Sequence, residues 1–232
     1  MSEKRYTVAV VGATGMVGRT MIQVLEERKF PVRRLVPFAS ARSAGTVLQF
    51  GGADVTVQAL TEDALRGAGA QFVLFSAGAS VSRAFAPVAV SAGAIVVDNS
   101  SAFRMDPAVP LVVPEVNPQA VHRHGGIIAN PNCSTIQMVV ALKPLHDAFG
   151  IRRIVVSTYQ SVTGAGQRGY DQLMAEVHGE TAPVQKFPHR IAFNCIPHID
   201  TFEEDGYTRE ETKMMRETVK IMGDPGIRVT AT

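Results

Sequence analysis

The chain opens with a strand, a glycine loop and a helix in immediate succession. Thr7–Val11 is an unbroken apolar run, Gly12, Gly15 and Gly18 follow with GxxGxxG spacing, and the helical pattern ends near Arg28. Backbone N–H groups of such a loop, together with the helix N-terminus, can hold a pyrophosphate, although glycines that only pack a helix give the same letters. We predict a dinucleotide-binding loop formed by Gly12, Thr14, Gly15, Met16, Val17 and Gly18.

The alternation of strands and helices continues through the first half of the chain. Short apolar segments occur at Val32–Phe38, Phe72–Ser76, Ala94–Val97 and Ile127–Ala129, separated by helical stretches such as Ser80–Ser91. This order is typical of a parallel sheet with helices on its faces. We therefore predict an α/β fold with a Rossmann-type, doubly wound, mostly parallel sheet over residues 1–132.

The pattern changes after residue 132. Ile151–Thr158 indicates a longer strand, Gly164–Gly166 a flexible turn, and Arg168–Val177 and Thr208–Met222 are helical segments. We expect a second, α+β catalytic and dimerisation domain over residues 133–232. A strand-like run begins at Ile227 and the chain stops within it, so we expect this domain to be incomplete, with an unpaired sheet edge.

Charge and cysteine usage narrow the class of partner. The chain has 23 basic and 21 acidic residues, a formal charge of +2, which shows no electrostatic footprint for nucleic acid or an anionic membrane. No run approaches the roughly 20 apolar residues that span a bilayer, and no signal peptide is visible. Cys133 and Cys195 form no disulfide framework or zinc spacing. We expect small-molecule partners, no metal and a cytoplasmic location.

The segment after the second strand bears on the choice of dinucleotide. Proteins that bind NAD usually carry an acidic residue at the end of that strand, whereas here Ser40, Arg42 and Ser43 occur in the next few positions. A guanidinium and two hydroxyls suit the 2′-phosphate of NADP. The pattern favours NADP over NAD, and the alternative is that Arg42 is an ordinary solvated loop charge.

Cys133 lies between a strand and a helix. Ile127–Ala129 has the character of a buried strand, and Thr135–Phe149 carries apolar residues at helical spacing. The positive end of a helix dipole favours an anion, and a helix N-terminus is a setting in which thiolates form easily. A cysteine can also be a small buried hydrophobe, but the polar neighbours Asn132 and Ser134 favour a nucleophile.

These motifs, together with Asn99–Arg104, Thr158–Gly166 and Asn194–Asp200, resemble the aspartate-semialdehyde dehydrogenase family from the first strand to Thr232. The resemblance implies NADPH-dependent reductive dephosphorylation of aspartyl 4-phosphate to aspartate 4-semialdehyde, on the route to lysine, threonine, methionine and isoleucine. The Cys133 thiolate would displace phosphate and form a thioester for the nicotinamide to reduce. The resemblance also implies a homodimer for the full-length protein.

The family pattern assigns roles to further residues. By resemblance, Gln160 orients the substrate beside Cys133, Arg104 meets the phosphate, Glu210 contacts the substrate amino group, and Lys213 contacts the phosphate. Asn132 offers a polar contact to the transferred group, and the residues expected to approach the cofactor are Ser161, Thr163 and Gly164. Without the resemblance, Arg104 reads as a surface charge and Glu210 with Lys213 as a solvated i, i+3 ion pair.

The resemblance also implies a histidine and a carboxylate-binding arginine beyond Thr232. No histidine in the chain stands at the matching position, and His198 reads as part of a structural loop. General acid–base help is worth 10²–10⁴-fold, so we expect impaired catalysis from the chain as it stands.

Three alternatives remain open. One is N-acetyl-γ-glutamyl-phosphate reductase, which has a glycine where Asn132 stands. Another is a noncatalytic NADP-binding fragment. Glyceraldehyde-3-phosphate dehydrogenase shares the thioester logic, but its glycine loop differs and Arg42 favours NADP.

Overall fold

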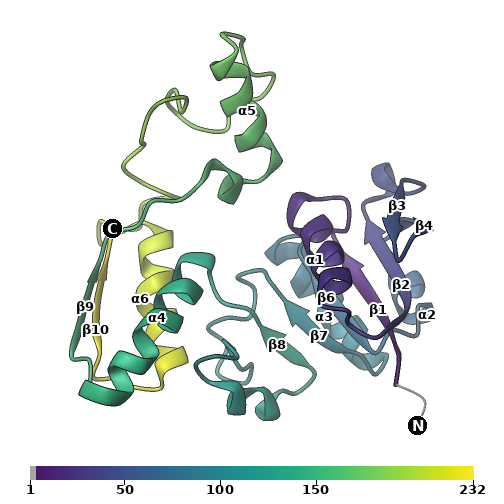
Figure 1. Cartoon of the computed structure of the whole chain (residues 1–232), viewed down its shortest axis with the longest axis horizontal. Coiled ribbons are helices and arrows are strands. Elements are labelled where there is room, and N and C mark those ends of the chain that lie inside the picture. Colours follow the sequence, from purple (N-terminus) through teal and green to yellow (C-terminus); the bar gives the residue numbers. More distant parts are fainter. Residues whose placement is uncertain (1–3) are drawn as a thin grey trace. The chain divides into compact units, whose positions relative to one another are not determined.

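The computed structural model describes residues 4–232 (Figure 1). The chain divides into two compact units, Met1–Asn132 and Cys133–Thr232. Each unit has its own sheet, and the first carries the larger one.

The first unit is built on a six-stranded sheet with the order β5-β2-β1-β6-β7-β8, visible as the purple to teal arrows of Figure 1. All neighbouring strands are parallel. The chain moves outward from β1 in one direction through β2 and β5, and in the other through β6, β7 and β8. The predicted doubly wound fold is confirmed. The strands are β1 (Tyr6–Val11), β2 (Val32–Ala39), β5 (Gln58–Ala59), β6 (Phe72–Phe75), β7 (Ile95–Asp98) and β8 (Ile127–Ala129).

The central strands are apolar without interruption because both of their faces are buried. Ala9 and Val11 of β1 point into a core that contains residues of α2 (Glu62–Gly67) and α3 (Ala79–Ser91). Val10 points the opposite way, into a core shared with α1 (Met16–Glu27). Side chains alternate along a strand, so helices on both sides require apolar residues at every position.

Four short strands and helices of this unit were not anticipated from the sequence. An antiparallel hairpin joins β3 (Val47–Phe50) to β4 (Ala53–Thr56) through Gly51 and Gly52, both at positive φ. β5 and α2 were also missed. β3, β4 and β5 are at most half-buried, so they have little of the apolar periodicity that marks the central strands.

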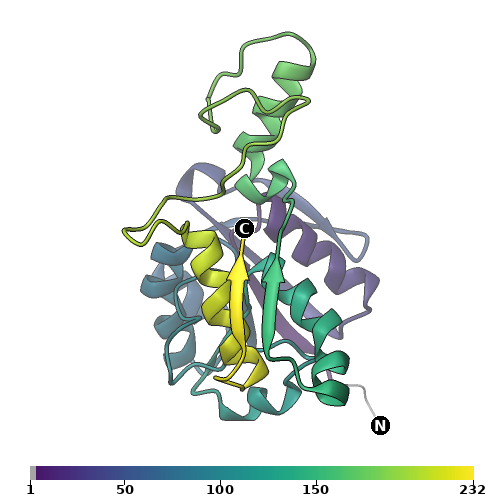
Figure 2. The same cartoon turned by 90° about the vertical axis from the view of Figure 1, so that its left-hand side faces the viewer.

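The second unit contains a parallel pair of strands, β9 (Arg153–Val156) and β10 (Arg228–Ala231). Helices α4 (Cys133–Phe149) and α6 (Arg209–Met222) lie on one face of this pair, as the two views show (Figures 1 and 2). Ile154 and Ala231 are buried on that side, whereas Val155 points away from it and is 71% exposed. The sheet therefore has one covered and one open face.

The region after β9 differs from its expected structure. The strand predicted over Ile151–Thr158 is only the four residues of β9, and the turn predicted over Gly164–Gly166 overlaps a 3-10 helix, η3 (Val162–Ala165). Ser161 caps this helix by accepting a hydrogen bond from the Thr163 N–H, and the Gly164 N–H bonds to the Ser161 carbonyl at 3.0 Å. These bonds define the start of η3, which begins several residues after β9 ends.

Two longer helices match the predicted segments closely. α6 begins after Thr208, whose hydroxyl accepts a bond from the Glu211 N–H while the Glu211 carboxylate accepts one from the Thr208 N–H, a reciprocal capping box. The helix ends at Gly223, which adopts the left-handed conformation. The other helix is α5 (Gln167–Val177).

Two side chains of α5 organise the long connection to α6. The Gln172 side-chain oxygen accepts bonds from the Lys186 and Phe187 N–H groups, and Glu176 accepts bonds from the Ile191 and Ala192 N–H groups. The Ala192 N–H, followed by the Gln172 amide, holds the pKa of Glu176 below its ordinary value. The irregular connection is thus held to α5 by hydrogen bonds to the side chains of Gln172 and Glu176.

Two of the three glycines in the first loop have distinct geometric requirements. Gly12 has φ +88°, and a Cβ there would lie 3.0 Å from the Ser76 backbone. A Cβ at Gly18 would overlap the Gly12 carbonyl, with the carbonyl carbon only 2.8 Å away. Gly18 lets α1 pack directly on the loop, which is one role of the third glycine in dinucleotide-binding folds.

We predict that Gly18→Ala destabilises the protein by about 1–3 kcal/mol, because the added methyl group meets backbone that cannot move aside. Gly67→Ala is the matched control, since a Cβ at the last residue of α2 meets nothing within 4 Å. That control should be neutral or stabilising by up to about 1 kcal/mol. Denaturant unfolding measures both, and equal stability of the two variants would contradict the packing role of Gly18.

Candidate functional site

The loops that follow the parallel strands lie along one edge of the first sheet. The switch in winding direction falls between β1 and β6, and doubly wound sheets bind ligands outside the carboxyl ends of the strands at this point. The Gly12 loop follows β1, and Ser76 follows β6. The Ser76 hydroxyl donates to the Val11 carbonyl at 3.2 Å, which holds the two segments together.

The N-terminus of α1 is suited to an anion. Its N-cap is Gly15, no side chain caps the helix, and its first turn has no acidic residue. The first N–H groups of a helix have no partner within the helix, and its dipole favours negative charge there. Arg19 donates to the Thr14 carbonyl at 3.1 Å, which fixes the preceding turn. The predicted loop residues thus have the arrangement that a pyrophosphate cradle requires.

The segment after β2 lies beside this loop. The Gly12 and Ala13 N–H groups donate to the Phe38 carbonyl at 2.9 and 3.0 Å, so the ends of β1 and β2 are joined. Ser40 begins the 3-10 helix η1 (Ala41–Ser43), within which Arg42 is exposed. An exposed guanidinium next to the loop is where a 2′-phosphate would be recognised.

Arg104 is not a surface charge. It is 8% exposed, its Nε donates to the Asn130 carbonyl and its Nη2 to the Asn99 carbonyl, both at 3.0 Å. The Asn130 amide in turn donates to the Asn99 side-chain oxygen at 2.6 Å. The guanidinium is therefore held between the residues that follow β7 and β8, and the surface-charge interpretation is wrong.

A buried carboxylate supports the loop that carries Arg104. Asp98, fully buried at the end of β7, accepts bonds from the hydroxyls of Ser82 and Ser100, both at 2.7 Å, and from the Ser100 N–H at 3.0 Å. The Ser100 hydroxyl also accepts a bond from the Ala102 N–H. These bonds determine the course of the loop.

Cys133 is the first residue of α4, and its side chain is exposed. The interpretation of a buried hydrophobe is therefore wrong for this cysteine. Gln160, which follows β9, donates from Nε2 to the Cys133 sulfur at 3.3 Å. Asn132 and Ser134 on either side are buried, so the exposed thiol lies between two buried polar residues. Cys133 and Gln160 are 27 positions apart, and only the family resemblance linked them in the sequence. In the structure they are in contact.

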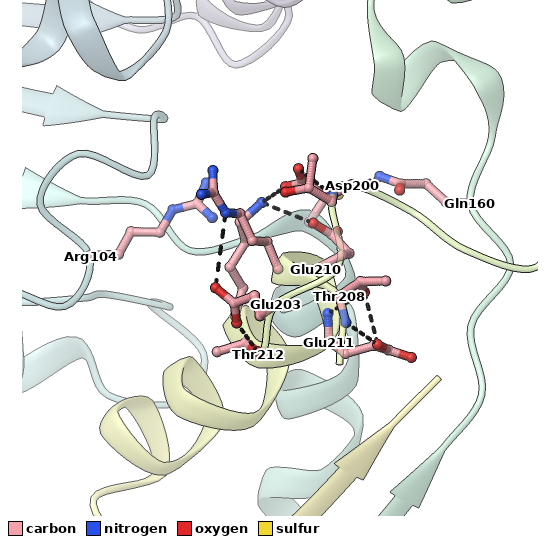
Figure 3. A network of polar contacts seen from close by, with 12 residues as sticks. Arg104, Gln160, Asp200, Glu203, Thr208, Glu210, Glu211 and Thr212 are labelled. Carbon is pink, nitrogen blue, oxygen red and sulfur yellow. Dashed lines mark hydrogen bonds and ion pairs between the residues drawn. The ribbon is translucent and has the colours of Figure 1, made fainter. Parts of the chain in front are cut away.

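Lys213 lies between two carboxylates. Its ammonium is 2.7 Å from Asp200 Oδ2 and 3.3 Å from Glu210 Oε2, near the start of α6; Figure 3 shows Asp200 and Glu210 converging there. The Glu210 side chain is only 10% exposed, so the solvated-pair interpretation does not hold. Partial burial works against the charge of Lys213, but the hydrogen bond to Asp200 and the field of Glu210 outweigh it, and the pKa of Lys213 is raised.

Asp200 is a residue of this cluster to which the sequence assigned no role. Partial burial opposes its ionisation, but the bonds from Lys213 and from the Thr201 N–H prevail, and the pKa of Asp200 is lowered. Its backbone has φ +69°, uncommon for a non-glycine residue. Asp200 lies 13 positions before Lys213, across an irregular loop, so no spacing rule links them. Its only sequence signal was membership of the Asn194–Asp200 motif.

The remaining residues expected at the cofactor belong to the turn after Gln160. Ser161, Thr163 and Gly164 are exposed, and the Thr163 hydroxyl donates to the Ser161 hydroxyl at 3.0 Å. No group of three or more metal-binding side chains occurs within residues 4–232. Over the same residues, no helix has both the length and the apolar character of a membrane span.

A doubly wound nucleotide-binding fold, followed by a unit that presents an exposed cysteine at a helix N-terminus beside an amide, is an arrangement expected of a nicotinamide-dependent oxidoreductase. Family models agree: residues 7–124 match the NAD-binding domain of semialdehyde dehydrogenases, and residues 142–232 match their dimerisation domain. The chain belongs to the aspartate-semialdehyde dehydrogenase family, as the sequence motifs predicted.

Individual relatives support this assignment over almost the whole chain. Aspartate-semialdehyde dehydrogenase of Aquifex aeolicus is 58% identical over 98% of this chain and 68% of its own length. The crystal structure of the Vibrio cholerae enzyme II complexed with ASA has a TM-score of 0.94 and 51% identity, over 99% of this chain and 70% of that one. The Candida albicans enzyme with NADP has a TM-score of 0.74 and 26% identity, over 98% and 66%.

We predict that Lys213→Met destabilises the protein by about 1–3 kcal/mol at neutral pH, between the values for exposed and buried ion pairs. The Asp200 contribution is fully present above the unfolded-state pKa of aspartate, about 3.9, and is lost as the pH falls through the lower folded-state pKa. The difference from wild type should therefore shrink below about pH 4. Denaturant unfolding across pH 3–7 measures it.

Arg209→Met is the control for this prediction. Arg209 is on the same helix, but its side chain is 64% exposed and 3.9 Å from Glu203. Its loss should change stability by less than about 0.5 kcal/mol. A pH-independent deficit in Lys213→Met would contradict the ionic origin of the effect.

Proposed function

We propose that the protein converts L-aspartyl 4-phosphate to L-aspartate 4-semialdehyde by NADPH-dependent reductive dephosphorylation, in the biosynthesis of lysine, threonine, methionine and isoleucine. The observation that carries the proposal is the 3.3 Å contact between Gln160 Nε2 and the exposed Cys133 sulfur, in a chain of this family. Relatives at 52–58% identity named for this activity support it.

The first chemical step belongs to Cys133. Its thiolate attacks the acyl carbon, the new C–S bond forms as the C–O bond to phosphate breaks, and phosphate leaves with the bonding electrons. Cys133 is the first residue of α4, so its sulfur is presented at the N-terminus of that helix. The Gln160 amide, fixed beside the sulfur, orients the acyl group without needing any change of its own protonation.

Three charged side chains have signs complementary to the charges of the substrate. Arg104 in the first unit and Lys213 in the second each offer a cation to phosphate, and Glu210 offers a carboxylate to the substrate ammonium. Asn132 supplies a polar side chain next to the nucleophile. Burial of Arg104 and Glu210 reduces solvent screening, so their charges act more strongly than surface charges would.

NADP is the proposed cofactor, and the first unit fits it. The N–H groups at the start of α1 have no side-chain cap and suit a pyrophosphate, and Gly18 lets that helix pack directly on the Gly12 loop. Ser40, Arg42 and Ser43 suit the 2′-phosphate, and Ser161, Thr163 and Gly164 are proposed contacts from the second unit. When bound, NADPH supplies the hydride that reduces the thioester on Cys133.

We further propose a homodimer formed through the second unit, whose family model is described as a dimerisation domain. The open face of β9 and β10, with Val155 exposed, is consistent with such an interface. Two free cysteines suit the reducing cytoplasm. The alternative N-acetyl-γ-glutamyl-phosphate reductase is disfavoured because Asn132 stands where that enzyme has glycine.

We predict that, in the complete enzyme, Cys133→Ala abolishes phosphate-dependent reduction of NADP with aspartate semialdehyde, because no sulfur remains to carry the acyl group. NADP affinity should change by less than about twofold, since the cradle is untouched. Cys195→Ala is the matched control, because Cys195 is also free and exposed. Turnover in Cys133→Ala would exclude the covalent step, as would substrate-dependent acylation of Cys195 instead of Cys133 in mass spectrometry.

We predict that Arg42→Ala weakens NADP binding about 10–100-fold, the loss of charge-assisted hydrogen bonds worth about 1.5–3 kcal/mol, and leaves NAD binding unchanged. Arg66→Ala removes an exposed arginine of α2 and should affect neither cofactor. Titration calorimetry with both dinucleotides measures the ratio. Equal losses for NADP and NAD would contradict recognition of the 2′-phosphate by Arg42.

A further inference from the structure

Gly164 faces the side chain of Gln160. A Cβ placed on Gly164 would lie 2.5 Å from Gln160 Nε2, 2.8 Å from Cδ and 3.2 Å from Cγ. The same Nε2 is the atom that donates to the Cys133 sulfur. The amide therefore occupies space that any side chain at position 164 would fill.

The backbone does not explain a glycine at this position. Gly164 is not among the residues with positive φ, and its N–H closes an ordinary turn on the Ser161 carbonyl. Gly166, two residues later, is the opposite case: its φ is +77° and a Cβ there would meet nothing within 4 Å. Glycine is required at position 166 by the backbone conformation, and at position 164 by the nearby side chain of Gln160.

The neighbour that an alanine would meet is the flexible end of a side chain. All three atoms near the added Cβ belong to Gln160, and none is backbone. The glutamine can rotate away at little cost, so the turn should keep its structure. The contact with the sulfur cannot survive, because the amide must move by roughly 1 Å, a displacement that can reduce a catalytic rate about 100-fold.

We propose that Gly164 is a positioning residue for catalysis: the absence of a side chain at this position keeps the Gln160 amide against the Cys133 sulfur. The inference rests on the proposed roles of Cys133 and Gln160. It gives Gly164 a function within the second unit that differs from a cofactor contact, and the two functions make different predictions.

A double-mutant cycle separates them. Gly164→Ala should lower kcat about 10–100-fold while NADP affinity changes by less than about twofold. Gln160→Ala should cause a similar loss. In the double variant the shortened residue 160 no longer meets the added methyl group, so turnover should be within about twofold of Gln160→Ala alone, a strongly non-additive result.

Thermal unfolding shows that the loss is local. The melting temperature of Gly164→Ala should match wild type, whereas the control Gly166→Ala, which adds the same methyl group to a strained backbone, should melt lower. Two results would overturn the positioning role of Gly164 and leave the proposed function intact. One is a kcat of the double variant that falls by the product of the two single losses, and the other is weaker NADP binding by Gly164→Ala. Wild-type turnover in Gln160→Ala would overturn the proposed role of Gln160 and this inference with it.

Discussion

Parallel pairing of β1 with β2 and β6 is the constraint on which the rest of the first unit depends. Parallel strands all end at the same edge, so the chain must place every loop that follows them there. The Gly12 loop, the Arg42 segment and the asparagines that hold Arg104 are all products of this geometry. β8 then leads through three residues to Cys133, the proposed nucleophile, which is the first residue of α4.

Buried polar groups give this architecture its precision. Arg104 donates hydrogen bonds to two backbone carbonyls, and Asp98 accepts hydrogen bonds from two serine hydroxyls. Lys213 forms ion pairs with Asp200 and Glu210. Each charge has partners within its own unit, as burial demands. A charge held by several bonds has little freedom to reorient, which reduces the reorganisation needed when a charged substrate arrives.

Several site residues could be predicted because their signals are local or belong to a motif. The glycine loop follows from spacing, and the Cys133 corner from the change of periodicity at Ala129. Asp200 and the fit of Gly164 against Gln160 could not be predicted in this way. Asp200 reaches Lys213 across an irregular loop, and the fit of Gly164 depends on where one amide lies in space.

The sequence by itself determined the doubly wound sheet, helix α6 and the family, because burial on both faces and helix capping leave patterns in neighbouring residues. It also identified Gln160 and Cys133 as partners, but by resemblance. Only the tertiary structure decided that Arg104 is buried, that Asp200 completes the Lys213 cluster, and that Gly164 makes room for an amide. These features depend on distances between segments far apart in the chain, which no local pattern encodes.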